Sequence, residues 1–112
     1  MSRRSYVPDR GDIVWLQFSP QAGHEQAGHR PALVLSPAAY NRLSGQMLCC
    51  LMTNHKKGYP FEVVVTDAPD YPSVVLADQV KSLDWKVRRA VKKGTATSDV
   101  IAETLSKLQA LL

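Results

Sequence analysis

Residues 22–37 read AGHEQAGHRPALVLSP, and the change of composition within this stretch decides how the chain is expected to fold. Residues 23–31 hold two glycines, two histidines, a glutamate and an arginine, a mixture typical of a surface loop that carries chemistry. The continuous apolar run at residues 32–35 is typical of a strand buried on both faces. The stretch therefore predicts a polar loop that continues into a buried strand over residues 31–36.

On both sides of this stretch, short apolar or β-branched runs alternate with turn-forming residues. The runs predict strands, and the residues between them predict turns. We expect strands at residues 12–18, 31–36, 47–53, 61–66, 74–77, 79–83 and 86–91. A bend is expected near Asp78. One or two helical turns are expected at residues 37–45, because Pro37 suits a helix start and Gly45 suits a helix end.

The last segment carries the clearest helical pattern. Thr97 or Ser98 is expected to cap it, and Asp99 lies favourably in its first turn. Apolar residues recur there at helical spacing: Ile101, Leu105, Leu108 and Leu112. Many short strands followed by one amphipathic helix predict a mainly β fold, a small barrel with a C-terminal α-helix packed on it. With 112 residues, the chain is expected to form a single domain, 1–112.

Charge and composition narrow the function classes. The net charge of +4 favours an acidic partner such as nucleic acid. We expect no membrane association, because no apolar run approaches the roughly 18 residues that span a bilayer and the N-terminus lacks the apolar stretch of a secretory signal. Cys49 and Cys50 are adjacent, so on a strand they face opposite sides and are poorly placed to bridge. These features predict a cytoplasmic protein with reduced thiols.

Metal and covalent chemistry find little support in the spacing of the residues. His24 and His29 flank Glu25 but lie five residues apart, and the glycines around them disfavour the helix that a zincin motif needs. There is no Gly-x-Ser-x-Gly motif, and the two cysteines lie among Leu and Met, where thiols are usually inert. A phosphate-cradling glycine pattern is missing as well. We therefore expect neither a metal nor an organic cofactor.

Four side chains together suit the cleavage of RNA: Glu25, His29, Arg30 and Thr53. Cleavage without metal needs a base for the 2′-hydroxyl proton, an acid for the departing 5′-oxygen, and donors for the charge that builds on the phosphate. Glu25 suits the base and Arg30 the charge stabiliser. The Thr53 hydroxyl would donate to a non-bridging oxygen. Since imidazole titrates near neutrality, His29 would serve as the acid or hold the RNA.

Each of these residues also has a purely structural interpretation. Glu25 and Arg30 would pair across the loop, and Thr53 would cap the end of a strand. His29 would be a structural histidine whose hydrogen bonds are made within the fold. Taken singly, these interpretations compete with the functional ones. The combination with a basic chain favours the functional interpretation.

Basic and aromatic residues elsewhere supply further candidate RNA contacts. Lysines 56–57 and residues 86–93 would attract a phosphate backbone, or would simply solvate the edge of a sheet. Trp15, Tyr59 and Phe61 would stack on bases, or would pack in the core as strand aromatics usually do.

The chain resembles the MazF/PemK (Kid) family of toxin endoribonucleases in five blocks, in the family's order and close to its spacing: YVPDRGDIVWLQFSP, EQAGHRPALVLSP, KGYPFEVVV, LADQVKSLDW and KKGTAT. The blocks extend over nearly the whole chain and are together far more specific than one short motif. The resemblance implies an SH3-like barrel of the CcdB/Kid/MazF type with a C-terminal helix, assembled as a homodimer.

The same resemblance implies a toxin of a type II toxin–antitoxin system. Such a toxin cuts single-stranded mRNA at short specific sequences without a metal ion, leaves a 2′,3′-cyclic phosphate and a 5′-hydroxyl, and so inhibits translation and growth. The implied partners are single-stranded RNA and a cognate antitoxin, whose acidic, disordered C-terminal tail blocks the RNA groove.

The family's site residues carry over to matching positions. Its catalytic glutamate, arginine and threonine match Glu25, Arg30 and Thr53. The positions implied to bind RNA are His29, Lys57, Gln79 and Lys81, the last two within the ADQVKS block.

The chain also departs from the family pattern in its loops. Asn54 and His55 follow Thr53 where other polar residues are usual, His24 precedes the glutamate, and residues 67–73 differ. Because such loops would touch bases, the recognised RNA sequence is not assumed to be the family's best-known one.

Two other function classes compete with this hypothesis. CcdB-type toxins share the implied fold and poison gyrase by protein binding, but they end in Trp-Gly-Ile, whereas this chain ends Gln-Ala-Leu-Leu. A non-catalytic binder of single-stranded RNA fits the charge and leaves Glu25 unexplained. The site residues separate these classes, which the fold alone would not.

Overall fold

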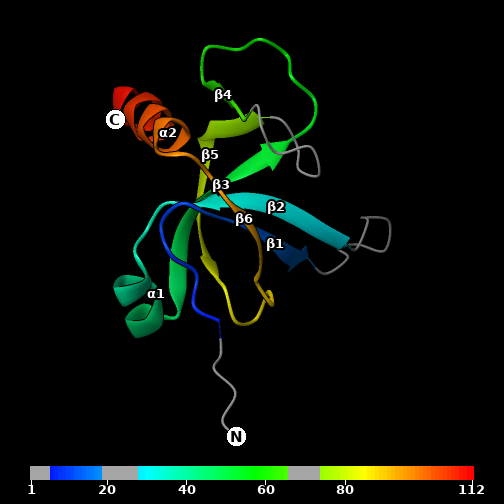
Figure 1. Ribbon diagram of the computed structural model, residues 1–112, viewed down its shortest axis with the longest axis vertical. Coiled ribbons are helices and arrows are strands. Elements are labelled where there is room, and N and C mark those ends of the chain that lie inside the picture. The colour runs from blue at the N-terminus through cyan, green and yellow to red at the C-terminus, as the bar shows by residue number, and fades with distance from the viewer. Residues whose placement is uncertain (1–5, 19–27, 66–73) are drawn as a thin grey trace, which may run out of the picture.

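Strand pairing organises the part of the chain that the computed structural model describes, residues 6–18, 28–65 and 74–112. One antiparallel sheet has the strand order β4-β5-β3-β2-β1-β6 (Figure 1). Its strands are β1 (Asp12–Phe18), β2 (Gly28–Val34), β3 (Gln46–Thr53), β4 (Glu62–Val64), β5 (Val74–Asp84) and β6 (Val91–Thr95). The helices are α1 (Ala38–Ser44) and α2 (Ser98–Ala110).

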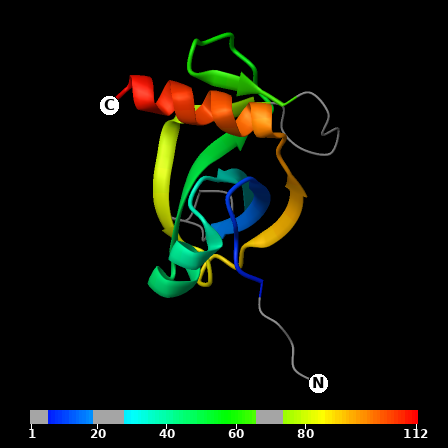
Figure 2. The ribbon, with the colours of Figure 1, turned by 60° about the vertical axis from the view of Figure 1, so that its left-hand side comes forward.

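The central strands are buried on both faces, because the curled sheet has an apolar cluster on each side. One cluster includes Leu33 and Cys50, and the other includes Ala32 and Cys49. Successive strand residues point to opposite faces, so the adjacent cysteines enter different clusters, as predicted. In Figure 2 the sheet curls with α2 lying across one end and α1 at the other.

Helix α2 covers the cluster that contains Leu33. Ile101, Leu105 and Leu108 pack against that cluster, whereas Leu112 lies beyond the helix and is 95% exposed. The Thr97 side chain caps the helix by accepting from the Val100 N–H at 3.2 Å, as the sequence predicts. The predicted fold class is confirmed: a mainly β, SH3-like curled barrel with the C-terminal helix packed on it.

The predicted strand at residues 86–91 is wrong. Residues 85–89 form turns, in which the Arg88 N–H donates to the Asp84 carbonyl at 3.2 Å and Arg89 adopts a φ of 51°. Trp85 is buried and donates from Nε1 to the Asn41 carbonyl at 2.8 Å, which holds the start of these turns against the core. The last strand is β6, where Lys92 and Lys93 lie within the strand instead of closing it.

Several strand boundaries also differ from the prediction: β2 ends at Val34, β3 begins at Gln46, and β4 spans only Glu62–Val64. Residues 74–77 and 79–83 belong to one continuous strand, β5, whose register shift lies at the expected bend. Strand β2 begins at Gly28, three residues before the predicted start, because residues 28–30 pair with the end of β1. His29 and Arg30 therefore lie on a strand and not in a loop.

Candidate functional site

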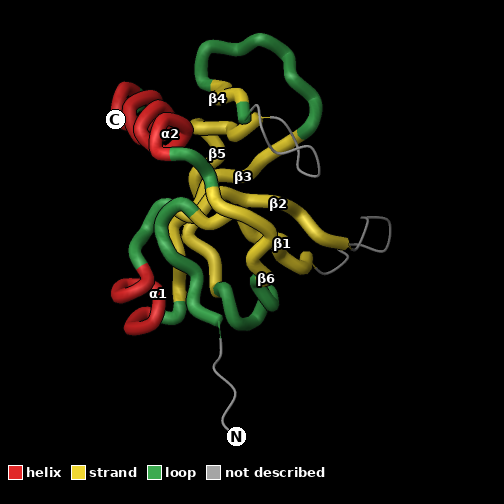
Figure 3. Tube along the Cα trace, in the orientation of Figure 1, coloured by secondary structure: helices red, strands yellow, loops and turns green. Residues whose placement is uncertain are grey.

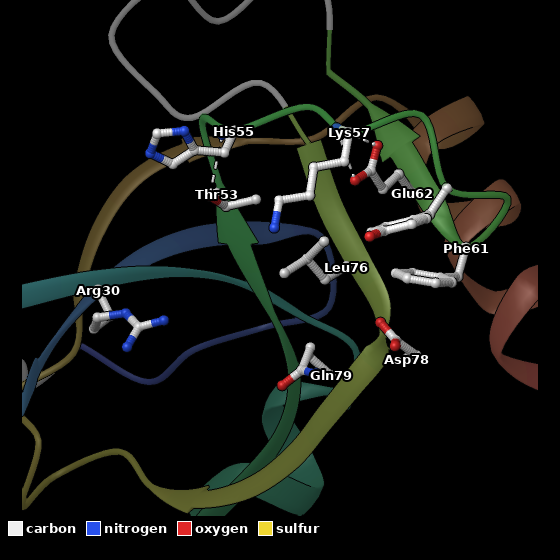
Figure 4. A pocket seen from close by; sticks show the side chains of 10 residues that line it. Arg30, Thr53, His55, Lys57, Phe61, Glu62, Leu76, Asp78 and Gln79 are labelled. Carbon is white, nitrogen blue, oxygen red and sulfur yellow. Dashed lines mark hydrogen bonds between the residues drawn. The ribbon is translucent and has the colours of Figure 1, made fainter.

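A groove of about 580 Å³ opens where the end of β3 meets the connection from residue 54 to residue 60 (Figures 3 and 4). Figure 3 shows this connection as a long arc that leaves β3 and returns at β4. The residues that line the groove come from β2, β3, this connection, β4 and β5: Arg30, Thr53, His55, Lys57, Tyr59, Phe61, Glu62, Leu76, Asp78 and Gln79.

Strand register explains why Arg30 and Thr53 share the groove. Strands β2 and β3 are antiparallel, with Ala32 opposite Leu51. The same register, continued by two residues, brings Arg30 level with Thr53. Alternation then directs both side chains to the face that carries Ala32 and Leu51. The guanidinium of Arg30 and the hydroxyl of Thr53 thus both border the groove, beyond the apolar cluster that contains Ala32 and Leu51.

A bulge on β5 brings Asp78 and Gln79 to the groove. Cys50 of β3 pairs with Val80 and Met52 pairs with Val75, so residues 76–79 lie opposite a single residue of β3. Extra residues on one strand bend that strand and redirect its side chains. The ADQ part of the ADQVKS block forms this bulge, and both polar side chains are exposed.

The connection at residues 54–60 is held by side-chain hydrogen bonds at both ends. The Thr53 Oγ1 accepts from the His55 N–H at 3.1 Å, which leaves the hydroxyl proton of Thr53 able to donate. The carboxylate of Glu62, a residue only 6% exposed, accepts from the backbone N–H groups of Lys57 and Gly58. Lys57 then extends its side chain toward the middle of the groove (Figure 4).

Two stacked aromatic rings form part of the groove wall. The rings of Tyr59 and Phe61 have centroids 5.1 Å apart and an interplanar angle of 23°. Tyr59 is 50% exposed, so an apolar face beside Lys57 is open to solvent. Exposed aromatic faces beside a cation are typical of sites that stack nucleic-acid bases.

His29 lies in a second hollow, of about 380 Å³, that we call the Trp15 hollow. It is lined by Trp15, His29, Val91 and Lys93. The rings of Trp15 and His29 lie edge to face, with centroids 6.2 Å apart and planes at 79°. His29 precedes Arg30 on β2, and alternation along the strand directs the two side chains to opposite faces.

The structure therefore brings together four of the residues predicted for the site, Arg30, Thr53, Lys57 and Gln79. Lys81 lies further along β5, opposite Cys49, and is exposed but lines neither hollow. Glu25, the predicted base, lies outside the described residues, as does His24.

Sequence reasoning missed two acidic residues of the groove, Glu62 and Asp78. A signal for Glu62 was available, because it is the one charged residue in the apolar strand FEVVV and directly follows a basic turn. Nothing in the sequence singled out Asp78 beyond its place at an expected bend.

Other chemistry has little support among the described residues. They contain no group of three or more His, Cys, Asp or Glu side chains that could hold a metal ion. Burial raises the pKa of both Cys49 and Cys50 to about 12, so neither thiol is a ready nucleophile near neutral pH. No helix within the described ranges is long and apolar enough to cross a membrane.

Comparisons with known proteins agree with this geometry. Residues 9–112 match the family described as PemK-like, MazF-like toxins of type II toxin–antitoxin systems. The chain is 50% identical over 107 residues to the endoribonuclease toxin MazF of Escherichia coli K12, with 96% of each chain covered. It is 41% identical over 109 residues to the endoribonuclease toxin ChpB of the same strain, with 93% of each covered.

Solved structures give the same result. A MazE–MazF crystal structure from Deinococcus radiodurans superposes with a TM-score of 0.90 at 56% identity, with 96% of each chain covered. MazF alone from the same organism superposes with a TM-score of 0.84 at 56% identity, covering 96% of this chain and 97% of that one. The chain therefore belongs to the MazF-like, PemK-like family of toxins of type II toxin–antitoxin systems.

Proposed function

We propose that this chain, an endoribonuclease toxin, cuts single-stranded RNA at short specific sequences without a metal ion, and that the groove holds the phosphate that is cleaved. The observation that carries the proposal is one groove bordered by a guanidinium, a hydroxyl, an ammonium and a pair of stacked aromatic rings. These are the groups that a phosphodiester, which gains a second negative charge during the attack, and its flanking bases require.

Cleavage would proceed by attack within the RNA itself. A base, for which we propose Glu25, takes the proton of the 2′-hydroxyl, and the freed oxygen attacks the adjacent phosphorus. The bond from phosphorus to the 5′-oxygen breaks, and that oxygen receives a proton. The products are a 2′,3′-cyclic phosphate and a 5′-hydroxyl, so no external water is consumed.

The groove residues would stabilise the charge that develops during this attack. The planar fork of Arg30 suits the two non-bridging phosphate oxygens, and the Thr53 hydroxyl, which already accepts from the His55 N–H, would donate its proton to one of them. Lys57 would attract the phosphate backbone, and Gln79 and Asp78 present amide and carboxylate groups suited to base edges. Tyr59 would stack on a neighbouring base.

The remaining predicted contacts lie on either side of this groove. We propose that His29, in the Trp15 hollow, and Lys81, on β5, contact RNA that extends beyond the cleaved phosphate. His29 lies outside the groove, so we assign it to binding and leave the proton donor to the 5′-oxygen unassigned.

The proposal includes partners and assembly. The D. radiodurans relatives crystallised as MazE–MazF complexes, so we propose that a cognate antitoxin neutralises this chain through an acidic C-terminal tail. The cationic Arg30 and Lys57 of the groove suit such a tail. We also propose that residues 1–112 act as one domain, that two copies form a homodimer, and that the protein works in the cytoplasm. The gyrase-poison alternative is not favoured, because the relatives that match are endoribonucleases.

The test is to incubate the protein with a long unstructured RNA in excess EDTA and to map the cut sites and end groups. We expect discrete cuts with 5′-hydroxyl and 2′,3′-cyclic phosphate ends. Cleavage that needs added Mg²⁺ would contradict the metal-free mechanism. RNA that stays intact with and without Mg²⁺ would contradict the nuclease proposal, and gyrase supercoiling would be assayed next.

A further inference from the structure

The carboxylate of Glu62 is the least expected feature of the groove. Glu62 is 6% exposed, yet its charge is directed at backbone and not at a cation. Its Oε1 accepts from the Gly58 N–H at 2.9 Å, and Oε1 and Oε2 accept from the Lys57 N–H at 3.2 and 3.1 Å. Among the described residues, the ion pairs are Lys92 with Asp12 and Lys107 with Glu103, so the Lys57 ammonium remains outside any of them.

The two successive N–H groups of Lys57 and Gly58 form a concavity around the carboxylate of Glu62. Gly58, whose φ of 84° lies in the left-handed region, turns the chain directly after the second of these donors. Such a concavity of backbone donors usually binds an external anion, but here a side chain of the same chain occupies it. The connection is thereby wrapped around an internal carboxylate.

Glu62 itself is firmly fixed. It pairs with Leu76 in the sheet, its N–H donates to the Tyr59 carbonyl at 3.1 Å, and its carbonyl accepts from Lys107 Nζ of α2 at 2.9 Å. The C-terminal helix and the sheet therefore fix Glu62, and Glu62 in turn fixes the connection at residues 54–60.

We infer that Glu62 is a positioning residue: its carboxylate fixes the backbone of Lys57 and Gly58 so that the Lys57 ammonium is presented to RNA phosphate in the groove. Figure 4 shows the two parts of this arrangement, with dashed bonds from the Lys57 backbone to Glu62 and the Lys57 side chain extended the opposite way. The inference rests on the proposed RNA-cleaving function and adds a residue to it.

The sign of the effect on binding distinguishes positioning from simple electrostatics. Glu62→Gln removes one negative charge next to the groove, so charge alone would tighten RNA binding. Loss of the charge-assisted hydrogen bonds would instead loosen the connection and weaken binding. We expect KM for an RNA oligonucleotide to rise about tenfold in Glu62→Gln, with kcat little changed.

Asp99→Asn is the matched control, because it removes an exposed carboxylate of α2 and changes the net charge equally. We expect this variant to keep the wild-type KM or to lower it slightly. Gly58→Ala tests the same connection without touching Glu62. An added Cβ there meets no atom within 4 Å, so the fold is undisturbed while the left-handed φ is strained, and KM is expected to rise as in Glu62→Gln.

The decisive measurement is a double-mutant cycle with Lys57→Ala. If Glu62 acts through Lys57, then Glu62→Gln adds no further increase of KM in the Lys57→Ala background. Equal increases of KM in both backgrounds, or a wild-type KM in Glu62→Gln and Gly58→Ala, would overturn the inference while the wild type still cleaves. If Glu62→Gln does not fold, Gly58→Ala and its own cycle with Lys57→Ala decide the question. No cleavage by the wild type would instead overturn the proposed function.

Discussion

The groove and the Trp15 hollow lie on opposite faces of the same short strand and differ in chemistry. Arg30 borders the groove with Thr53 and Lys57, so a guanidinium, a hydroxyl and an ammonium meet there. The preceding residue, His29, borders the Trp15 hollow, where an indole and Lys93 are the main neighbours. Alternation along β2 therefore separates a site suited to phosphate chemistry from one suited only to contact.

The largest effect is expected at the groove. Arg30→Ala removes the forked donor, and kcat/KM for an RNA oligonucleotide should fall about a hundredfold to a thousandfold. Arg30→Lys is the control, since it keeps the charge but loses the planar fork, and it should recover only part of the activity. Thermal unfolding of each variant checks the fold. Cleavage by Arg30→Ala at the wild-type rate would show that the groove does not act on the phosphate. The proposed difference between the groove and the Trp15 hollow would then be wrong.

The groove also shows how far the sequence could predict the site. Thr53 lies at the end of a strand that the sequence predicts, whereas Arg30 was expected in a loop and lies on β2 because residues 28–30 pair with the end of β1. The family resemblance nevertheless named both residues. The role of Glu62 could not be predicted, because its partners are the backbone N–H groups of Lys57 and Gly58, whose direction depends on the local backbone conformation. Because nearly every residue has a backbone N–H group, the sequence carries no signal for such a contact.

The fold was predictable where the local sequence pattern agrees with the long-range contacts of the folded chain. Strand β1 has the predicted bounds, Asp12–Phe18, because its run of β-branched and aromatic residues is followed in the sequence by Ser19 and Pro20. The prediction failed at residues 86–91, where KVRRAV has strand-like composition but turn hydrogen bonds to Asp84 and Trp85 decide the conformation. Those bonds depend on the burial of Trp85 beneath Asn41, which is a long-range effect.

A smaller effect is expected at the Trp15 hollow. His29→Ala removes the edge-to-face contact with Trp15, and if RNA stacks there, KM should rise about tenfold while kcat is unchanged. The measurement is steady-state cleavage of oligonucleotides of increasing length. The increase of KM should appear only once the RNA is long enough to reach beyond the groove. A fall in kcat with the shortest cleavable RNA would instead show that His29 acts in the chemical step, and the two hollows would then form one site.

The smallest effect concerns salt, and it tests whether the two hollows differ in how they bind RNA. Each phosphate neutralised on a single strand contributes about 0.7 to the slope of log K against log salt concentration. Lys57→Ala should therefore reduce the slope by about that amount, because Lys57 lines the groove that we propose binds phosphate. Lys93→Ala removes the same charge from β6, the edge strand of the sheet, where lysines discourage pairing with other strands. Its slope should match the wild type. Equal reductions of the slope in both variants would mean that the groove and the Trp15 hollow both bind phosphates. The two faces of β2 would then not differ in how they bind RNA.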